Sequence, residues 1–186
     1  FTVEVVDGRV PVIASGHVGE TLAEQITELT QMASTGIDCV VFVTNRLDPD
    51  HLGSEQLFKN VETLTKELPA NMRFGLYECP VPFRRLLSDE EIIYFAEDPR
   101  FVVLKDVSCD LDTVRRRVEL TKSANLVISN ANAAIAFEAM KSGASGFCGV
   151  FNNFHPDLYR WLQDEGEIHP ELAIELSRFL VLSAVT

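Results

Sequence analysis

Basic residues are scarce in this sequence of 186 residues: 16 lysines and arginines stand against 28 aspartates and glutamates, for a formal net charge of −12. Nucleic acids and anionic membranes are bound through basic patches, so we expect neither as the main partner. An anionic small molecule remains open, because one local positive group suffices. No apolar run approaches the ~20 residues of a membrane span, and the N-terminus has no signal-peptide pattern.

Metal-binding and redox motifs are also missing. The cysteines stand far apart with no C-x-x-C pair, which is typical of free buried thiols in a reducing cytoplasm. The histidines are equally scattered, and none has a ligand-type partner at i+4. We therefore expect a cytoplasmic protein without a metal site. The residues concerned are Cys39, Cys79, Cys109, Cys148, His17, His51, His155 and His169.

What the sequence does contain is a repeated order of a short apolar run, a polar or Gly/Pro turn and an amphipathic segment. The apolar runs are continuous rather than alternating, as in parallel strands covered by helices. Strict alternation of strand and helix predicts an α/β protein with a parallel sheet. The expected strands are 10–15, 38–43, 72–77, 101–105, 125–129 and 146–150.

The amphipathic segments carry helix signals at their ends. Ser88 precedes a run of acids as an N-cap, Gly143 is a helix stop, and Pro156 and Pro170 each follow a histidine where a helix is expected to start. "TVEVVDG" resembles the end of a further helix. The expected helices are 19–34, 54–68, 88–98, 111–122, 131–143, 155–166 and 169–185.

Two architectures fit these units: an open doubly wound sheet and part of a (β/α)8 barrel. A glycine-rich nucleotide loop would favour the open sheet, but "SGHVGET" at 15–21 is neither G-x-G-x-x-G nor a P-loop. A barrel usually needs ~250 residues, so six units leave two missing. We expect one partial barrel domain over 1–186, corresponding to units 3 to 8, with a C-terminal helical region beginning in 168–186, and a native polypeptide longer at both ends.

Chemistry in parallel α/β proteins lies at the C-terminal ends of the strands. Tyr77 ends one expected strand, Lys105 ends the next, and neighbouring strands lie about 4.8 Å apart. A phenol and an amine would then project at one rim. Lys105 is either a solvated rim lysine or a Schiff-base nucleophile in a dry pocket. Tyr77 is either a strand-end aromatic bonded to backbone or a proton-transfer group.

The stretches "FGLYECP" and "VVLKD" resemble the dihydrodipicolinate synthase/N-acetylneuraminate lyase family of class I aldolases. That family has Tyr-x-x-Pro at the end of one barrel strand and then an apolar strand that ends in the Schiff-base lysine, usually followed by an acid. Tyr77, Pro80, Lys105 and Asp106 match in type, order and spacing. "GRVPVIASG", "NLVISNANAA" and "GASGFCGVFNN" resemble further strands of the family, so the resemblance runs through nearly the whole chain.

The resemblance implies a (β/α)8 barrel with a C-terminal helical extension that assembles as a homo-oligomer, a dimer or tetramer. Lys105 would form an imine with pyruvate or another 2-oxo acid, without a separate cofactor, and Tyr77 would relay protons. The backbone carbonyl of Cys148 would lie close to the lysine, with Gly146 and Gly149 allowing the approach. Turn and packing geometry is the alternative explanation for these glycines.

The sequence also departs from the family. The Gly-Thr-Thr-Gly-Glu segment that binds the oxo-acid carboxylate should precede residue 1 and is not among these residues, and no tyrosine directly follows 38–43. A carboxylate-binding arginine is replaced by Pro82. Either Arg84 or Arg85 substitutes for it, or both cap or solvate the next helix. Asn130 stands where a Gly-Asp pair is common, and either lines a different pocket, together with Asn132, or is an ordinary loop asparagine.

Other polar clusters have simpler explanations. We expect loop solvation and capping for "DPDHLGSE" at 48–55, and a solvated helix face for Arg115, Arg116 and Arg117. Glu78 should point away from Tyr77, into the helix layer or an interface.

The favoured function is a lyase or aldolase acting on pyruvate or a sugar-derived 2-oxo acid. The alternatives are a non-catalytic sensor of such acids and an unrelated α/β protein.

Overall fold

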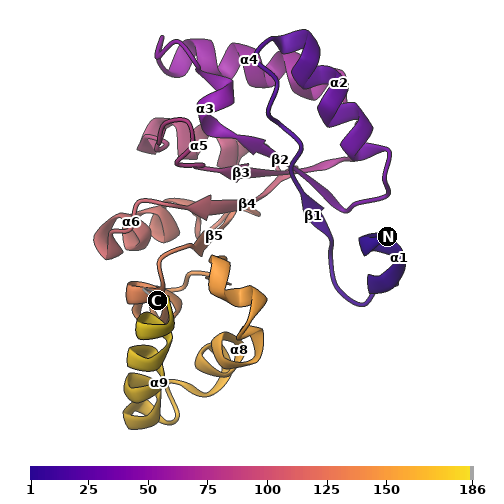
Figure 1. Ribbon diagram of the computed structural model, residues 1–186. Helices are drawn as coiled ribbons and strands as arrows, with labels where there is room; N and C mark the ends of the chain where they lie inside the picture. Colours follow the sequence, from indigo (N-terminus) through magenta and orange to yellow (C-terminus); the bar gives the residue numbers. More distant parts are fainter. Residues whose placement is uncertain (185–186) are drawn as a thin grey trace.

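The computed structural model describes residues 1–184, in which six parallel strands follow one another in the order of the sequence. A doubly wound sheet would reverse its strand order at a switch point, so sequential order identifies an arc of six consecutive units of a (β/α)8 barrel. The predicted fold class is confirmed (Figure 1). The strands are β1 Ile13–Ala14, β2 Cys39–Val43, β3 Arg73–Tyr77, β4 Phe101–Asp106, β5 Val127–Asn130 and β6 Gly146–Phe147.

The helices lie close to where their patterns predict them. The segment predicted as one helix at 131–143 is divided into a 3-10 turn and α7, and the short α3 was not predicted. Residues 185–186, where the predicted 169–185 helix and the 168–186 region end, lie outside the described part of the chain. The elements are α1 Thr2–Val6, α2 Leu22–Ala33, α3 Thr44–Leu47, α4 Ser54–Lys66, α5 Asp89–Glu97, α6 Leu111–Thr121, η1 Ala133–Ile135, α7 Ala136–Lys141, η2 Val150–Asn153, α8 Pro156–Glu165 and α9 Pro170–Ser183.

Several helix starts have the predicted chemistry. Ser88 accepts a hydrogen bond from the Glu91 amide while the Glu91 side chain accepts one from the Ser88 amide, a capping box at the start of α5. Thr21 forms the same arrangement at the start of α2. Pro156 and Pro170 occupy the first turns of α8 and α9, as predicted.

The two edge strands are shorter than predicted, and within residues 1–184 each pairs on one side only. The Val12 amide donates to the Asp38 carboxylate rather than to a strand, so β1 begins at Ile13. At the other edge, the carbonyl of Phe147 accepts from the Asn152 side chain, and β6 ends there. The predictions of strands over 10–15 and 146–150 were too long because they assumed neighbours that these residues lack among residues 1–184.

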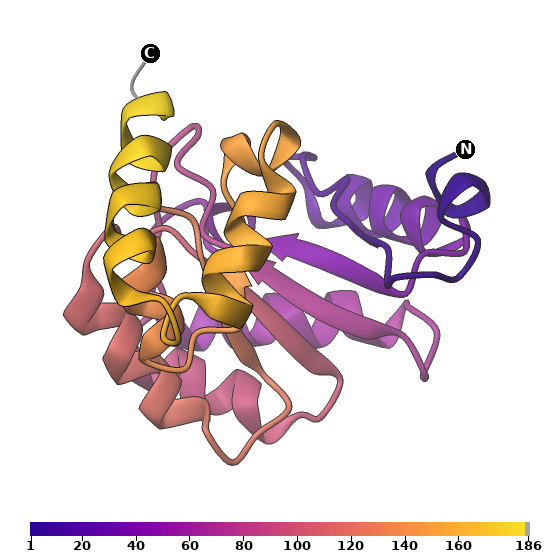
Figure 2. The same ribbon diagram turned by 90° about the horizontal axis from the view of Figure 1, so that it is seen from below.

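The sheet has two unlike faces. One is packed under the helices and contains the largest buried side chains, among them Phe42, Phe74 and Leu104. Figure 2 shows helices ranged along that side of the strands. On the opposite face, Val41, Gly75 and Val103 stand in one row, because Val41 pairs with Gly75 and Gly75 with Val103. In a barrel this second face is the interior, where side chains form layers.

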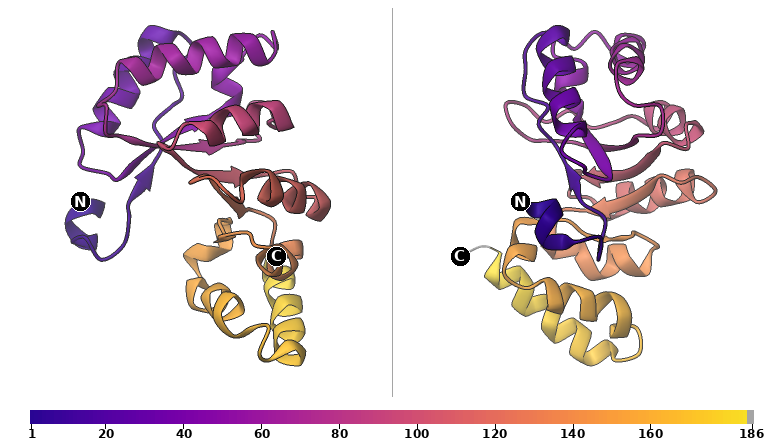
Figure 3. Two further views of the ribbon diagram at one scale, coloured as in Figure 1. Left: turned by 180° about the vertical axis from the view of Figure 1, so that it is seen from behind. Right: turned by 90° about the vertical axis from the view of Figure 1, so that its right-hand side faces the viewer.

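A separate hydrophobic cluster joins α7, α8, α9 and β6 at the end of the arc opposite α1 (Figure 3). Phe147 of β6 stacks on Tyr159 of α8 with ring centres 4.0 Å apart. This cluster fixes the C-terminal helices against the last strand. Among the described residues, no helix is both long and apolar enough to cross a membrane.

Candidate active site

One row of paired residues crosses β3 to β6, near the C-terminal ends of β3, β4 and β5 and at the first residue of β6. Tyr77 of β3 pairs with Lys105 of β4, Lys105 with Ser129 of β5, and Ser129 with Gly146 of β6. The Lys105 Nζ atom lies 4.3 Å from the centre of the Tyr77 ring. The structure therefore brings together the phenol and the amine that the sequence placed at one rim.

The amine of Lys105 projects from the interior face of the arc. Its sequence neighbours Leu104 and Asp106 are completely buried on the helix side, so the side chain between them points the other way. Lys105 is half-buried, and within residues 1–184 it forms no ion pair. Within the described residues, no carboxylate therefore holds the amine of Lys105 away from the space in front of the Tyr77 ring.

Burial raises the pKa of the Tyr77 phenol to about 12, and a hydrogen bond with the Cys79 side chain and the nearby thiols of Cys79 and Cys148 act in the same direction. These residues come from separate strands, since Cys79 follows β3 and Cys148 follows β6. With so high a pKa, Tyr77 keeps its proton at neutral pH. A role of the phenol in proton transfer at Lys105 stays a prediction.

Three other predicted site residues lie around β5 and β6. The Cys148 amide donates to the Asn130 carbonyl at 2.7 Å, which carries the β5–β6 pairing one residue further. Gly146 has a φ of 150°, so backbone geometry alone requires glycine there. Asn130 is 1% exposed, and its amide bonds to the backbone of Asn132. The role of the Cys148 carbonyl stays a prediction.

The two candidate arginines have different surroundings. Arg84 is exposed, and its Nη1 atom lies 3.4 Å from the carbonyl oxygen of Val107, just beyond β4. Arg85 forms ion pairs with Asp48 at 3.0 Å and Glu91 at 2.7 Å. Asp48 is 2% exposed, so the prediction of simple loop solvation was wrong for this residue. Only Arg84 reaches over the end of the Lys105 strand.

Sequence reasoning missed Arg117, which is 2% exposed rather than part of a solvated face. It donates two hydrogen bonds to Glu78, at 2.7 and 2.9 Å, and also contacts Asp106. Burial works against its charge, but the bonds and charges of the two acids prevail and raise the pKa of the guanidinium. The available signal was helical spacing, because Arg117 shares the buried stripe of α6 with Val114 and Thr121.

Asn45, in the short helix α3 that follows β2, is 1% exposed and was also missed. Its Nδ2 atom lies 3.0, 3.0 and 2.7 Å from the carbonyl oxygens of Cys79, Val81 and Phe83. The loop that follows Tyr77 is therefore held by α3, the helix that follows the neighbouring strand β2. No local pattern in the sequence marks such a contact, because the partners are backbone atoms far along the chain.

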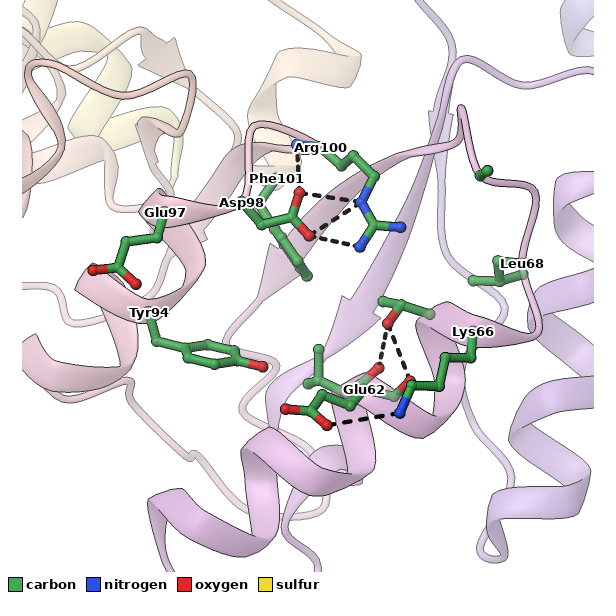
Figure 4. A pocket seen from close by; sticks show the side chains of 11 residues that line it. Glu62, Lys66, Leu68, Tyr94, Glu97, Asp98, Arg100 and Phe101 are labelled. Atoms are coloured by element: carbon green, nitrogen blue, oxygen red, sulfur yellow. Dashed lines mark hydrogen bonds and ion pairs between the residues drawn. The ribbon is translucent and has the colours of Figure 1, made fainter.

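A cavity of about 530 Å³ lies elsewhere, between α4 and α5 beside the N-terminal ends of the strands (Figure 4). Its two basic side chains are each paired with an acid: Lys66 with Glu62 at 3.8 Å and Arg100 with Asp98 at 2.6 Å. Active sites of parallel α/β folds lie at the other end of the strands. The rim around Lys105 is therefore the better candidate.

Comparison with known proteins agrees with this geometry. The family model described as the dihydrodipicolinate synthetase family matches residues 1–177. The chain belongs to this family. A 4-hydroxy-tetrahydrodipicolinate synthase of Rickettsia felis is 28% identical over 167 residues, which are 88% of this chain and 54% of that protein. One from Bacillus velezensis is 31% identical over 122 residues, or 65% of this chain and 40% of the relative. This family member thus spans about half the length of the curated relatives it matches.

Solved structures show the same fold. YagE, a prophage protein of the dihydrodipicolinic acid synthase family from E. coli K12 solved in complex with pyruvate, matches with a TM-score of 0.80 at 19% identity, over 97% of this chain and 60% of its own. A putative dihydrodipicolinate synthase from Thermus thermophilus matches with a TM-score of 0.78 at 24% identity, over 93% and 59%. At these identities the likeness establishes the fold alone.

Proposed function

We propose that this chain is part of a Schiff-base lyase or aldolase that acts on pyruvate or a sugar-derived 2-oxo acid. The observation that carries the proposal is the Lys105 amine over the Tyr77 ring at the C-terminal rim of adjacent strands, with no acid paired to it within residues 1–184. Membership of the family supports it. So do the relatives named as synthases and the structural neighbour solved with pyruvate.

The chemistry follows from the two groups. The unprotonated amine of Lys105 attacks the carbonyl carbon, and one proton passes from the nitrogen to the carbonyl oxygen to give a neutral carbinolamine. Tyr77 gives its proton to the departing hydroxyl, which leaves as water while the nitrogen lone pair forms the C=N bond of the protonated imine, and the Tyr77 phenolate is then reprotonated by solvent. The protonated imine then accepts the electron pair of an adjacent C–C or C–H bond as that bond breaks. The imine is itself the electron sink, so the proposal needs no separate cofactor.

We also propose a cytoplasmic homo-oligomer, a dimer or tetramer. The free state of Cys39, Cys79, Cys109 and Cys148 supports a reducing compartment. Large apolar side chains exposed on α9 support association with another copy. They are Leu172, Ile174, Phe179 and Leu182.

Borohydride reduction of the intact protein in the presence of pyruvate tests the function. We expect the mass of one reduced pyruvate imine, mapped to Lys105 by peptide analysis and lost in Lys105→Arg. Lys141→Arg is the matched control, because Lys141 also lies over an aromatic ring, 5.4 Å from the centre of Phe137, but pairs with Glu138. An adduct on another lysine, or thermal stabilisation by pyruvate without any adduct, would contradict the proposal.

A further inference from the structure

Arg117 joins the two residues that follow the candidate catalytic pair in the sequence. Glu78 comes directly after Tyr77, and Asp106 directly after Lys105. The guanidinium forms two hydrogen bonds to Glu78 and an ion pair with Asp106. A single side chain of α6 therefore connects the ends of β3 and β4 from the helix side of the sheet.

Backbone pairing between these strands weakens where the site begins. The Glu78 amide lies 3.4 Å from the Lys105 carbonyl oxygen, longer than the usual ~2.9–3.0 Å. Beyond this point the contacts are made by the Glu78 carboxylate, which accepts from the amides of Leu87 at 2.7 Å and Val107 at 3.0 Å. Side chains rather than the strand ladder thus fix the spacing of the two strand ends.

The cluster is dry and fully bonded. Glu78 and Asp106 are 0% exposed, and each carboxylate oxygen accepts at least one hydrogen bond. The two carboxylates of Glu78 and Asp106 and the one guanidinium of Arg117 together carry a formal charge of one negative unit. Removing Arg117 would leave two buried carboxylates without a counter-charge, which burial strongly disfavours. The two carboxylates would move apart, and the strand ends would shift with them.

We propose that Arg117 is a positioning residue: by holding Glu78 and Asp106, it keeps the Tyr77 phenol and the Lys105 amine at the separation that imine formation requires. The inference rests on the proposed function of Lys105 and Tyr77, and Arg117 acts through its two acids from the opposite face of the sheet. Displacements of about 1 Å in an active site can cost on the order of 10²-fold in rate.

The chain offers a matched control in Arg85. Arg85 also forms two hydrogen bonds to a buried glutamate, Glu91, and pairs with a buried aspartate, Asp48. Asp48 accepts from the amides of Leu52 and Gly53, much as Asp106 accepts from Ser108. The Arg85 cluster connects the segments before α4 and α5, and neither of its acids adjoins Tyr77 or Lys105. Its loss should disturb stability without changing the catalytic pair.

The experiment compares Arg117→Lys with Arg85→Lys, and Asp106→Asn with Asp48→Asn, in the intact protein with pyruvate as the probe. The first readout is the rate constant of borohydride-trapped imine formation at saturating pyruvate, together with the pyruvate concentration giving half that rate. The second, independent of chemistry, is the NMR shift of the Lys105 ε-methylene, assigned with Lys105→Arg and displaced upfield by the Tyr77 ring. Circular dichroism verifies that each variant is folded.

We expect Arg117→Lys and Asp106→Asn to lower the rate constant at least tenfold, change the half-saturating concentration less than threefold, and move the methylene shift toward its free value. Arg85→Lys and Asp48→Asn should keep the rate constant within twofold of the wild-type value. They should leave the Lys105 methylene shift unchanged. Equal losses in both clusters, or none at Arg117, would overturn the proposal. If Arg117→Lys does not fold, the milder Asp106→Asn decides. Absence of any adduct in the wild type would contradict the proposed function instead, while the methylene shift still tests the positioning.

Discussion

The Lys105 amine lies over the face of the Tyr77 ring, 4.3 Å from its centre, so an aromatic ring and a proton donor belong to one side chain beside the candidate nucleophile. Tyr77→Phe separates these two properties, because phenylalanine keeps the ring and loses the hydroxyl. We expect imine formation with pyruvate to slow by about 10²-fold or more, the usual contribution of general acid–base catalysis, with little change in melting temperature. Stopped-flow trapping with borohydride measures the rate.

Tyr94→Phe is the control for this substitution. Tyr94 is likewise half-buried and stacks on Phe58 with ring centres 3.9 Å apart, but it lies in the cavity between α4 and α5. The rate constant of imine formation in Tyr94→Phe should match that of the wild type. A Tyr77→Phe variant with an undiminished rate would show that the hydroxyl takes no part in proton transfer.

Local patterns were sufficient to predict the fold up to its edges. Continuous apolar runs predicted all six strands, and the capping residue Ser88 with Pro156 and Pro170 marked three helix starts, because these signals act within a few residues. The lengths of β1 and β6 were wrong, since the length of a strand depends on its neighbours. That information lies in the tertiary arrangement rather than in the segment itself.

The candidate site was predictable in part for a related reason. Tyr77 and Lys105 could be placed together because consecutive parallel strands end at one rim. Arg117 was misjudged because an arginine among two others resembles a solvated face, and only its contact with Glu78 and Asp106 explains its burial. The binding of substrate by Asn130 and by Arg84 stays a prediction.

Gly75 occupies a crowded layer one step below the site. A Cβ atom there would lie 2.9 Å from Val103 Cγ1, closer than real Cβ contacts, and 3.0 Å from Val41 Cγ2, which is tighter than most of them. We expect Gly75→Ala to lower the free energy of unfolding by about 1–3 kcal/mol through overpacking. Adding Val103→Ala should recover part of the loss, so the two changes would be non-additive in urea unfolding. If the changes in unfolding free energy from Gly75→Ala and Val103→Ala were strictly additive, this would argue against the crowded layer.

Asn45 holds the loop after Tyr77 through its amide hydrogens. Asn45→Ala removes the donor to the carbonyls of Cys79, Val81 and Phe83, and we expect a loss of about 1–3 kcal/mol in the free energy of unfolding. Asn45→Asp should be worse, because it turns an acceptor oxygen toward three others. Urea unfolding ranks the variants, with Asn125→Ala as the control, since Asn125 is exposed and donates once, to Pro99. A milder effect of Asp than of Ala would contradict the assigned amide orientation.

His17, 1% exposed, should make the protein sensitive to mild acid. Its Nδ1 atom accepts from the Val43 amide at 2.9 Å and its Nε2 atom lies 2.7 Å from the Gln25 carbonyl oxygen, an arrangement that suits the neutral ring. Burial lowers its pKa from 6.5 to about 4, although Gln25 and Glu28 oppose the shift. Between these values the unfolded chain binds the extra proton, so stability falls as pH decreases from 6.5 toward 4.

The full effect of this titration is about 3 kcal/mol in the free energy of unfolding, fully retained above pH 6.5. Urea unfolding at a series of pH values between 7 and 4 measures it. His17→Gln, which retains an acceptor for the Val43 amide but cannot titrate, should show a flatter pH dependence even though its stability at pH 7 is lower. His169→Gln is the control, because the His169 side chain is 56% exposed, and it should keep the wild-type slope. An unchanged slope in His17→Gln would assign the acid sensitivity to other groups.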